Sequence, residues 1–134
     1  MTDYSQHREQ AVILDYFGPS LGWFLDIGAN DGVTFSNTRA LWDMGWGGVL
    51  VDASPSAFET LKANARERWN TTCIHAAITE HDGVVTLHES SDTLVSSLNR
   101  AAEAVWRHHN FVWLPVEVPA MTIASLYAKA GTDK

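Results

Sequence analysis

The sequence predicts an α/β fold in which helices flank a partly parallel sheet, and three features predict it. Short apolar runs bounded by glycine, at residues 23–27 and 47–51, are typical of strands buried on both faces. Segments with helical spacing precede and follow each run. The resulting order of helix, strand, helix, strand, helix, strand indicates two right-handed crossover units on one sheet. Such sheets bind ligands beyond the carboxyl ends of their strands.

The first three elements are a helix, a strand and a second helix. The spacing predicts the first helix over residues 3–17, ended by Gly18 and Pro19. Residues 23–27 form the strand, and residues 36–44 form the second helix. The side chains expected to face the core are Val12, Ile13, Tyr16 and Phe17 around the first helix, and Phe35, Leu41 and Trp42 around the second.

Ser54 and Pro55 mark the start of a third helix, because serine is a favoured N-cap and proline a favoured first-turn residue. Apolar residues at helical spacing extend this helix to about Trp69. Pro115 predicts that its own strand lies near a sheet edge, and Gly131 ends the last helix. The later elements expected are strands at residues 72–78, 84–88 and 112–118 and helices at 99–108 and 123–130.

The composition indicates a single globular domain over residues 1–134, with 46% hydrophobic residues. A formal net charge of −7 disfavours a nucleic-acid partner, which would require a basic stripe. The single cysteine, Cys73, excludes an internal disulfide. No apolar run approaches the roughly 18 residues needed to span a bilayer. We therefore expect a cytoplasmic protein with no membrane or nucleic-acid partner.

The sequence Asp-Ile-Gly-Ala-Asn-Asp-Gly at residues 26–32 lies between the first buried strand and the next helix. Gly28 and Gly32 permit a tight turn and the close approach of a ligand. A dinucleotide site favours the spacing G-x-G-x-x-G, whereas this turn has G-x-x-x-G. Asp26 and Asp31 would also repel a pyrophosphate. An NAD(P)-binding domain is therefore the disfavoured alternative.

S-adenosyl-L-methionine (SAM) suits an acidic turn better than NAD does. Its amino group and sulfonium are cationic, and its carboxylate can use the N-terminus of a helix. Asp52 ends the second strand, 24 positions after Gly28, where an acid can accept both ribose hydroxyls of an adenosine. The residues thus predict SAM as the cofactor. A glycine turn that only packs strand against helix is the structural alternative.

Further motifs accompany this turn. They are Ser-Asn-Thr at residues 36–38, Gly-Trp-Gly at 45–47, Gly-Val-Leu-Val-Asp-Ala-Ser-Pro at 48–55, Ser-Ser-Leu at 96–98 and Thr-Ile at 122–123. In this combination, from about Trp23 to Gly131, the chain resembles the FkbM family of methyltransferases. The resemblance implies a Rossmann-like class I methyltransferase core, SAM as cofactor, and methyl transfer, usually to an oxygen of a small molecule or sugar.

The resemblance also implies roles for individual residues. Asp26, Gly28, Ala29 and Asn30 match positions that hold the methionine end, whereas Ser54, Ala76 and Ala77 match positions that flank the adenine. Asp52 matches the ribose-binding position. Ser36 and Asn37 either reach the SAM carboxylate or cap the following helix, and both roles stay open. The complete predicted cofactor site is Asp26, Gly28, Ala29, Asn30, Asp31, Gly32, Ser36, Asn37, Asp52, Ala53, Ser54, Ala76 and Ala77.

The chain departs from the family pattern in two places. The family commonly has Glu where this chain has Asp52, whose shorter arm should still reach the ribose with some loss of affinity. The family's fourth core strand and its acceptor pocket lie beyond Lys134, so the expected core is C-terminally incomplete. The strand from Trp23 to Ile27 then becomes an exposed edge, which predicts either a homo-oligomer that covers it or a marginally stable fragment.

The expected acceptor wall lies outside the sequence, so the sequence identifies no catalytic residue. A truncated, non-catalytic module that binds SAM or a protein partner is therefore the main alternative to an active enzyme. We expect no metal site. His108 and His109 are adjacent and cannot form the i, i+4 pair of a helical zinc site.

Overall fold

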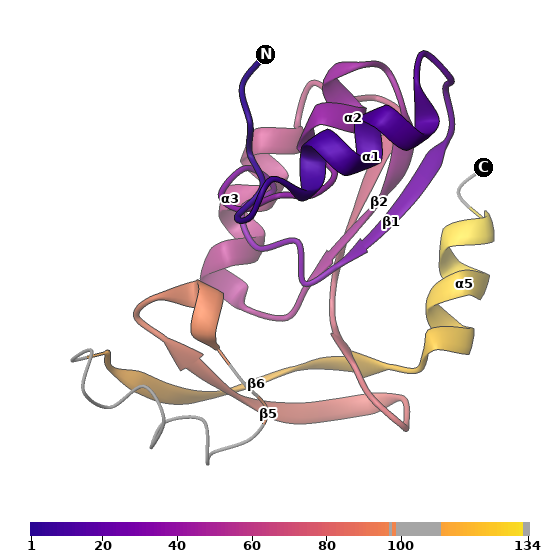
Figure 1. Cartoon of the computed structure of the whole chain (residues 1–134). Coiled ribbons are helices and arrows are strands. Elements are labelled where there is room, and N and C mark those ends of the chain that lie inside the picture. The colour runs from indigo at the N-terminus through magenta and orange to yellow at the C-terminus, as the bar shows by residue number, and fades with distance from the viewer. Residues whose placement is uncertain (97, 99–110, 133–134) are drawn as a thin grey trace.

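The computed structural model describes residues 1–96, 98 and 111–132, and it contains two three-stranded sheets (Figure 1). One sheet, here called the parallel sheet, has the order β1-β2-β3. The other, the mixed sheet, has the order β4-β6-β5. The α/β class predicted from the sequence is confirmed, but the strands divide between two sheets.

The parallel sheet is built from β1 (Trp23–Ile27), β2 (Gly47–Asp52) and β3 (Thr71–His75). Its central strand is the most deeply buried, because both of its faces are covered. Leu50 packs in one core cluster with Phe24, Trp42 and Leu61. Its neighbours Val49 and Val51 pack in another cluster on the opposite face. Successive side chains of β2 point to opposite faces of the sheet and therefore pack into two separate core clusters.

Helices cover both faces of the parallel sheet, as expected for crossover connections. The helices α1 (Glu9–Phe17), α2 (Arg39–Asp43) and α3 (Pro55–Ala65) lie on one side, and α5 (Ile123–Thr132) lies on the other (Figure 1). Leu126 of α5 is fully buried and packs in the cluster of Val49 and Val51. The result is a three-layer arrangement typical of a Rossmann-like core.

The mixed sheet consists of β4 (Ala77–Ile78), β5 (Gly83–Ser90) and β6 (Trp113–Met121). The β5 and β6 strands pair antiparallel, whereas β4 runs parallel to β6. We expected one strand over residues 72–78, which is wrong in detail. The chain leaves the parallel sheet after His75, and Ala77 already pairs with Ala120 of β6. This crossing brings β5 and β6 below the carboxyl end of the parallel sheet (Figure 1).

Four predicted helices differ in extent from those observed, and the first and the last are two of them. The first begins at Glu9, not at residue 3, and Val12 and Tyr16 are 71% and 81% exposed. Ile13 contacts the core as predicted, together with Leu14, which was not among the residues expected there. The four apolar residues of this helix are close together in the sequence, so their spacing did not show which of them face the sheet. The last helix passes Gly131 and continues to Thr132.

Two further aromatic residues expected to face the core are exposed. Phe35 is 50% exposed and has a left-handed φ of 55°, because the segment before α2 is a loop and not the helix predicted from residue 36. Trp69 is 94% exposed, since α3 ends at Ala65 and the chain turns toward β3. Leu41 and Trp42 are buried, as predicted. The helix expected over residues 99–108 lies outside the described residues.

Of the two strands predicted to lie at a sheet edge, β1 does so in the described part of the chain and β6 does not. β1 pairs only with β2, and Trp23 and Ile27 are 41% and 45% exposed. The edge predicted for the strand of Pro115 is wrong, because β6 is the central strand of the mixed sheet. β4 pairs with β6 only at Ala120 and Met121, so at Pro115 β6 pairs with β5 alone among the described strands, which is why proline is tolerated there. That a second copy of the chain covers β1 stays a prediction. Within residues 1–96, 98 and 111–132, no helix is long and apolar enough to cross a bilayer.

Candidate functional site

The glycine-rich turn after β1 folds across the carboxyl end of β2. The backbone N–H groups of Gly28 and Ala29 both donate to the carbonyl of Val51, at 2.8 and 2.9 Å. Gly28, Asn30 and Gly32 have positive φ values of 81°, 54° and 78°. The sequence therefore places two of these three left-handed positions at glycine, which adopts them without steric cost.

The two glycines of the turn serve different purposes. A Cβ on Gly32 would lie 2.7 Å from the ring of Trp42 and 2.8 Å from Leu61, so the close approach of the turn to the core requires glycine. A Cβ on Gly28 would meet nothing within 4 Å, because this residue faces an open cavity. Gly28 thus leaves room for a ligand against the backbone.

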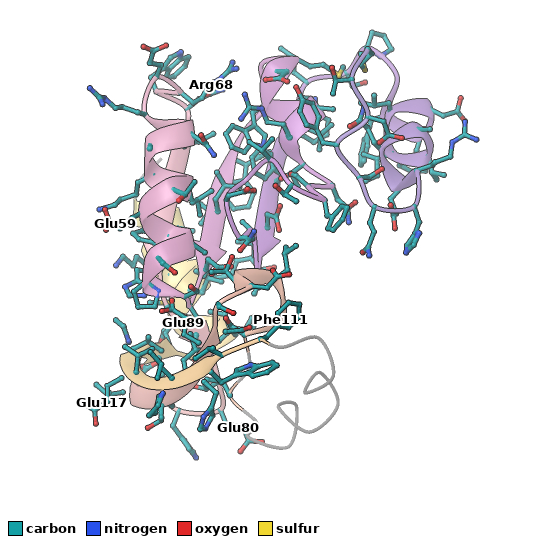
Figure 2. The ribbon with its side chains drawn as sticks, turned by 90° about the vertical axis from the view of Figure 1, so that its left-hand side faces the viewer. Glu59, Arg68, Glu80, Glu89, Phe111 and Glu117 are labelled. Carbon is teal, nitrogen blue, oxygen red and sulfur yellow. The ribbon has the colours of Figure 1, made fainter. Side chains whose placement is uncertain are left out.

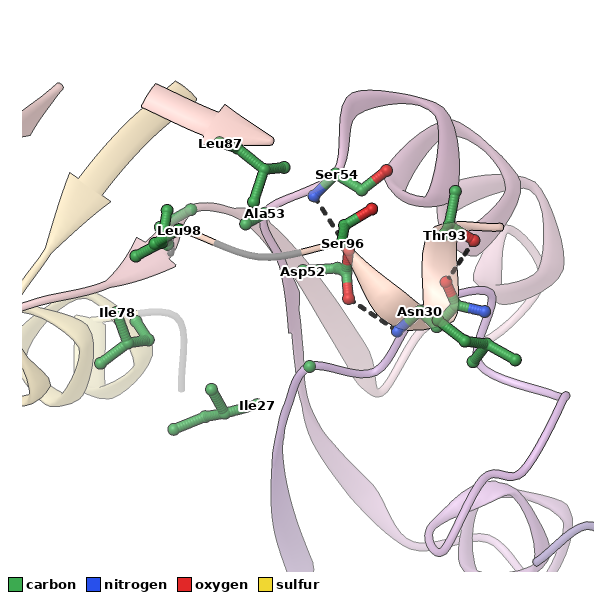
Figure 3. Close-up of a pocket in the computed structure, with 14 residues that line it drawn as sticks. Ile27, Asn30, Asp52, Ala53, Ser54, Ile78, Leu87, Thr93, Ser96 and Leu98 are labelled. Carbon is green, nitrogen blue, oxygen red and sulfur yellow. Dashed lines mark hydrogen bonds between the residues drawn. The ribbon is translucent and has the colours of Figure 1, made fainter. Parts of the chain in front are cut away.

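Asp52, the last residue of β2, holds the turn in place. Its Oδ1 accepts the backbone N–H of Asn30 at 2.8 Å, and its Oδ2 accepts the N–H of Ser54 at 3.0 Å (Figure 3). Burial raises the pKa of the Asp52 carboxyl, although these two N–H groups act in the opposite direction. Each carboxylate oxygen keeps acceptor capacity for a further hydrogen bond.

A cavity of about 270 Å³ lies beside Asp52 (Figure 3). Of the residues predicted from the sequence, those that line this cavity are Gly28, Asn30, Asp52, Ala53, Ser54, Ala76 and Ala77. Ile78 and Leu87, whose apolar side chains are larger than those of the alanines, also line this cavity. The cavity thus places one carboxylate beside a largely apolar wall.

A second cavity of about 190 Å³ lies on the other side of the turn. Predicted residues that line it are Asp26, Gly28, Ala29, Asn30, Ser36 and Asn37. Ile27, Gly28, Asn30 and Leu94 line both cavities, so the two adjoin. Small-molecule sites typically occupy about 300–1,000 Å³. Neither cavity alone reaches that range, and an elongated ligand would occupy both.

Asp26 adds a second carboxylate to this region. Its Oδ2 accepts the Thr38 hydroxyl at 2.6 Å, and burial raises the pKa of the Asp26 carboxyl. The negative charge of Asp26 in turn contributes to the raised pKa of Asp52, although less than burial does. Neither acid forms a salt bridge with Lys or Arg among the described residues. The site is therefore suited to a ligand that carries positive charge.

Two predicted site residues lie away from both cavities. Asp31 folds its carboxylate back onto the turn, where it accepts the N–H groups of Val33 and Thr34 at 2.8 and 2.7 Å. Burial would raise the pKa of Asp31, but these hydrogen bonds outweigh it and lower the pKa. Gly32 packs against the core, as described above. The structure thus places Asp31 and Gly32 where they shape the turn.

Ser36 lines the smaller cavity and lies in the loop just before α2. Its hydroxyl oxygen accepts the N–H groups of Thr38 and Arg39 at 3.2 and 2.9 Å. These contacts bind the backbone at the start of α2, whose N-cap is Thr38 and not Ser36. A contact of Ser36 or Asn37 with the SAM carboxylate stays a prediction. Asn37 lines the cavity and is exposed.

Part of the cavity wall could not be foreseen from the turn. Residues that the sequence did not assign to the site are Ile27, Ile78, Leu87, Thr93, Leu94, Ser96 and Leu98. Thr93 and Leu94 belong to the short 3-10 helix η1 (Thr93–Val95), which follows β5. The Ser-Ser-Leu motif at residues 96–98 was the one signal that pointed to this segment. It did not show where the segment packs.

A glycine-rich turn over a parallel sheet, with an acid at the end of the next strand, is typical of a Rossmann-like domain. The chain belongs to the FkbM methyltransferase family, since the model of the methyltransferase FkbM domain matches residues 26–134. No curated protein and no solved structure matches the chain. Membership of a methyltransferase family implies the use of SAM.

Proposed function

We propose that the chain binds SAM at the paired cavities and takes part in methyl transfer to an oxygen of a small molecule or sugar. The main support is the position of the Asp52 carboxylate at the end of β2, where two backbone N–H groups fix it. The carboxylate lines a cavity and can accept further hydrogen bonds from a ligand there. The FkbM family membership supports methyl transfer as the reaction class. The oxygen acceptor rests on the family resemblance.

The adenosine half of SAM fits the larger cavity. Each Asp52 oxygen would accept one ribose hydroxyl, since each is occupied by one N–H donor and retains a second lone pair. The apolar side chains of Ile78 and Leu87 would contact the adenine. Ala53 and Ala77 line the same cavity with short side chains, which leave width for a planar ring.

The methionine half fits the smaller cavity. Gly28 presents bare backbone there, and Asp26 offers negative charge for the ammonium group. When bound, SAM supplies an electrophilic methyl group on its sulfonium. The chain's own residues hold the donor in one orientation, which is the main requirement of a transfer that depends on alignment. The charge of Asp26 and Asp52 favours the cationic donor over a dinucleotide.

Two measurements test this proposal. Calorimetric titration with S-adenosylhomocysteine should give saturable binding with one ligand per chain, and NADH should give none. Asp52→Ala should weaken the binding, whereas Asp15→Asn on the exposed surface of α1 should not. No heat from a folded sample at high protein concentration would sink the proposal.

The second measurement is transfer of a labelled methyl group from SAM to a panel of hydroxyl-bearing small molecules and sugars. Transfer that depends on Asp52 supports an active methyltransferase. Binding of S-adenosylhomocysteine without transfer to any acceptor would favour the alternative of a non-catalytic SAM-binding module. Binding of NADH in place of S-adenosylhomocysteine would favour a dinucleotide-binding domain.

A further inference from the structure

The segment from β5 to η1 touches the candidate site at two points. At the first, the hydroxyl of Thr93 donates to the side-chain oxygen of Asn30 at 2.7 Å (Figure 3). Asn30 is 9% exposed, and its own N–H donates to Asp52. The Thr93 hydroxyl thus acts on the residue that holds Oδ1 of Asp52.

At the second point, Glu89 reaches the N-terminus of α3. Its Oε2 accepts the hydroxyl of Ser54, and also the N–H and hydroxyl of Ser56 at 3.2 and 3.0 Å. Figure 2 shows Glu89 beside the lower end of α3, with Glu59 further along the helix. Ser54 is 2% exposed, and its N–H donates to Oδ2 of Asp52. Glu89 therefore acts on the residue that holds the other carboxylate oxygen.

These contacts form a ring that starts and ends in the same segment. It runs from Glu89 through Ser54 to Asp52, and from Asp52 through Asn30 to Thr93. Only three residues separate Glu89 from Thr93 along the chain. The Asp52 carboxylate lies at the far point of the ring, and its two oxygens are fixed from opposite sides.

We propose that Thr93 and Glu89 are positioning residues that hold the Asp52 carboxylate in the orientation required by the two ribose hydroxyls. This inference rests on the proposed binding of SAM at Asp52. Asn30 adopts a left-handed conformation, which asparagine tolerates better than most residues, and its side-chain oxygen is held in that conformation by one contact from outside the turn. The Thr93 hydroxyl supplies that contact. A carboxylate that accepts two hydroxyls must be placed to within a fraction of an ångström.

Thr93→Val and Thr93→Ser test the proposal as a matched pair. Valine has nearly the shape of threonine but lacks the hydroxyl, whereas serine keeps it. Thr86→Val is the control, because Thr86 is an exposed β5 residue outside the cavities. Calorimetry should show that Thr93→Val binds S-adenosylhomocysteine about three- to tenfold more weakly, the loss of one neutral hydrogen bond. Thr93→Ser and Thr86→Val should stay within about twofold of the wild type.

A readout without ligand separates this inference from the proposed function. In Thr93→Val, hydrogen exchange of the Asn30 N–H should become several-fold faster, while Thr93→Ser keeps the wild-type rate. Glu89→Leu should likewise speed exchange of the Ser54 N–H. Unchanged exchange at Asn30 in Thr93→Val would overturn the inference, whatever the protein binds. Faster exchange in a chain that does not bind S-adenosylhomocysteine would overturn the proposed function and the ribose role together, and leave only a structural ring.

Discussion

Replacement of Asp52 by alanine removes the one carboxylate that touches both the glycine-rich turn and the larger cavity. The change deletes two acceptors, so the N–H groups of Asn30 and Ser54 lose their partners. Both N–H groups border a cavity that water can enter, so the fold should survive. The ligand, by contrast, loses both hydrogen bonds from its ribose hydroxyls.

The magnitude follows from the state of the free carboxylate. A hydrogen bond to a charged group contributes roughly 1.5–3 kcal/mol. The ribose hydroxyls and the carboxylate both exchange hydrogen bonds with water for these bonds, so part of that gain is offset. We therefore expect a net loss of about 1–3 kcal/mol. This corresponds to an affinity for S-adenosylhomocysteine that falls about 5- to 150-fold.

Calorimetry with two ligands isolates the ribose contact. The wild type should bind S-adenosylhomocysteine more tightly than its 2′-deoxyribose analogue, and Asp52→Ala should bind the two almost equally. Asp52→Glu keeps a carboxylate and should retain more affinity than alanine. If Asp52→Ala still prefers the ligand with the full diol by the wild-type ratio, the assignment of Asp52 to the ribose is wrong.

Three further outcomes are expected. Gly32→Ala should lower the free energy of unfolding by at least about 1–2 kcal/mol in urea titrations, because its left-handed φ disfavours a Cβ and that Cβ would press on Trp42; a neutral result would refute this packing. Leu126→Ala should cost about 2–5 kcal/mol in the same assay, since Leu126 is fully buried between α5 and the parallel sheet; a cost below that range would mean that α5 packs loosely. Burial raises the pKa values of Asp26 and Asp52 above 3.8, so SAM should bind more weakly as the pH falls toward the raised values. The contribution of the two acids to folding stability has the opposite dependence on pH. It is greatest below their unfolded pKa values and declines as the pH rises through the raised values. Calorimetry across this pH range checks the effect on SAM binding, and urea titration of Asp52→Ala checks the effect on folding stability. A binding constant that does not change with pH would contradict the expected effect on binding.

The turn and its two flanking strands could be predicted from the sequence because their signals are local. A five-residue apolar run between glycines allows few structures other than a buried strand, and Asp52 follows directly from the end of the second run. Parallel strands bring their carboxyl ends to one edge, so the closeness of Asp26, Asp52 and the turn followed from topology. The helix start at Ser54 was equally local, and its side chain caps α3 as expected.

The contacts of β5 and η1 could not be predicted, because they depend on long-range packing. Nothing near Thr93 indicates that it donates to Asn30, 63 residues earlier. The exposed positions of Phe35 and Trp69 have a related cause. Helical spacing shows that apolar residues can share a face, but it does not show where a helix begins or ends. The roles of Asp31 and Ser36 within the turn also required the hydrogen-bond geometry.

The most direct test of the account is a titration of isotope-labelled chain with S-adenosylhomocysteine, followed by nuclear magnetic resonance. The account predicts saturable shifts of the backbone signals of Gly28, Asn30, Asp52 and Ser54, with little change at Asp15 on α1. Two results from a well-dispersed spectrum of a folded chain would contradict it: no change at saturating ligand, or changes only in the signals of residues far from the glycine-rich turn.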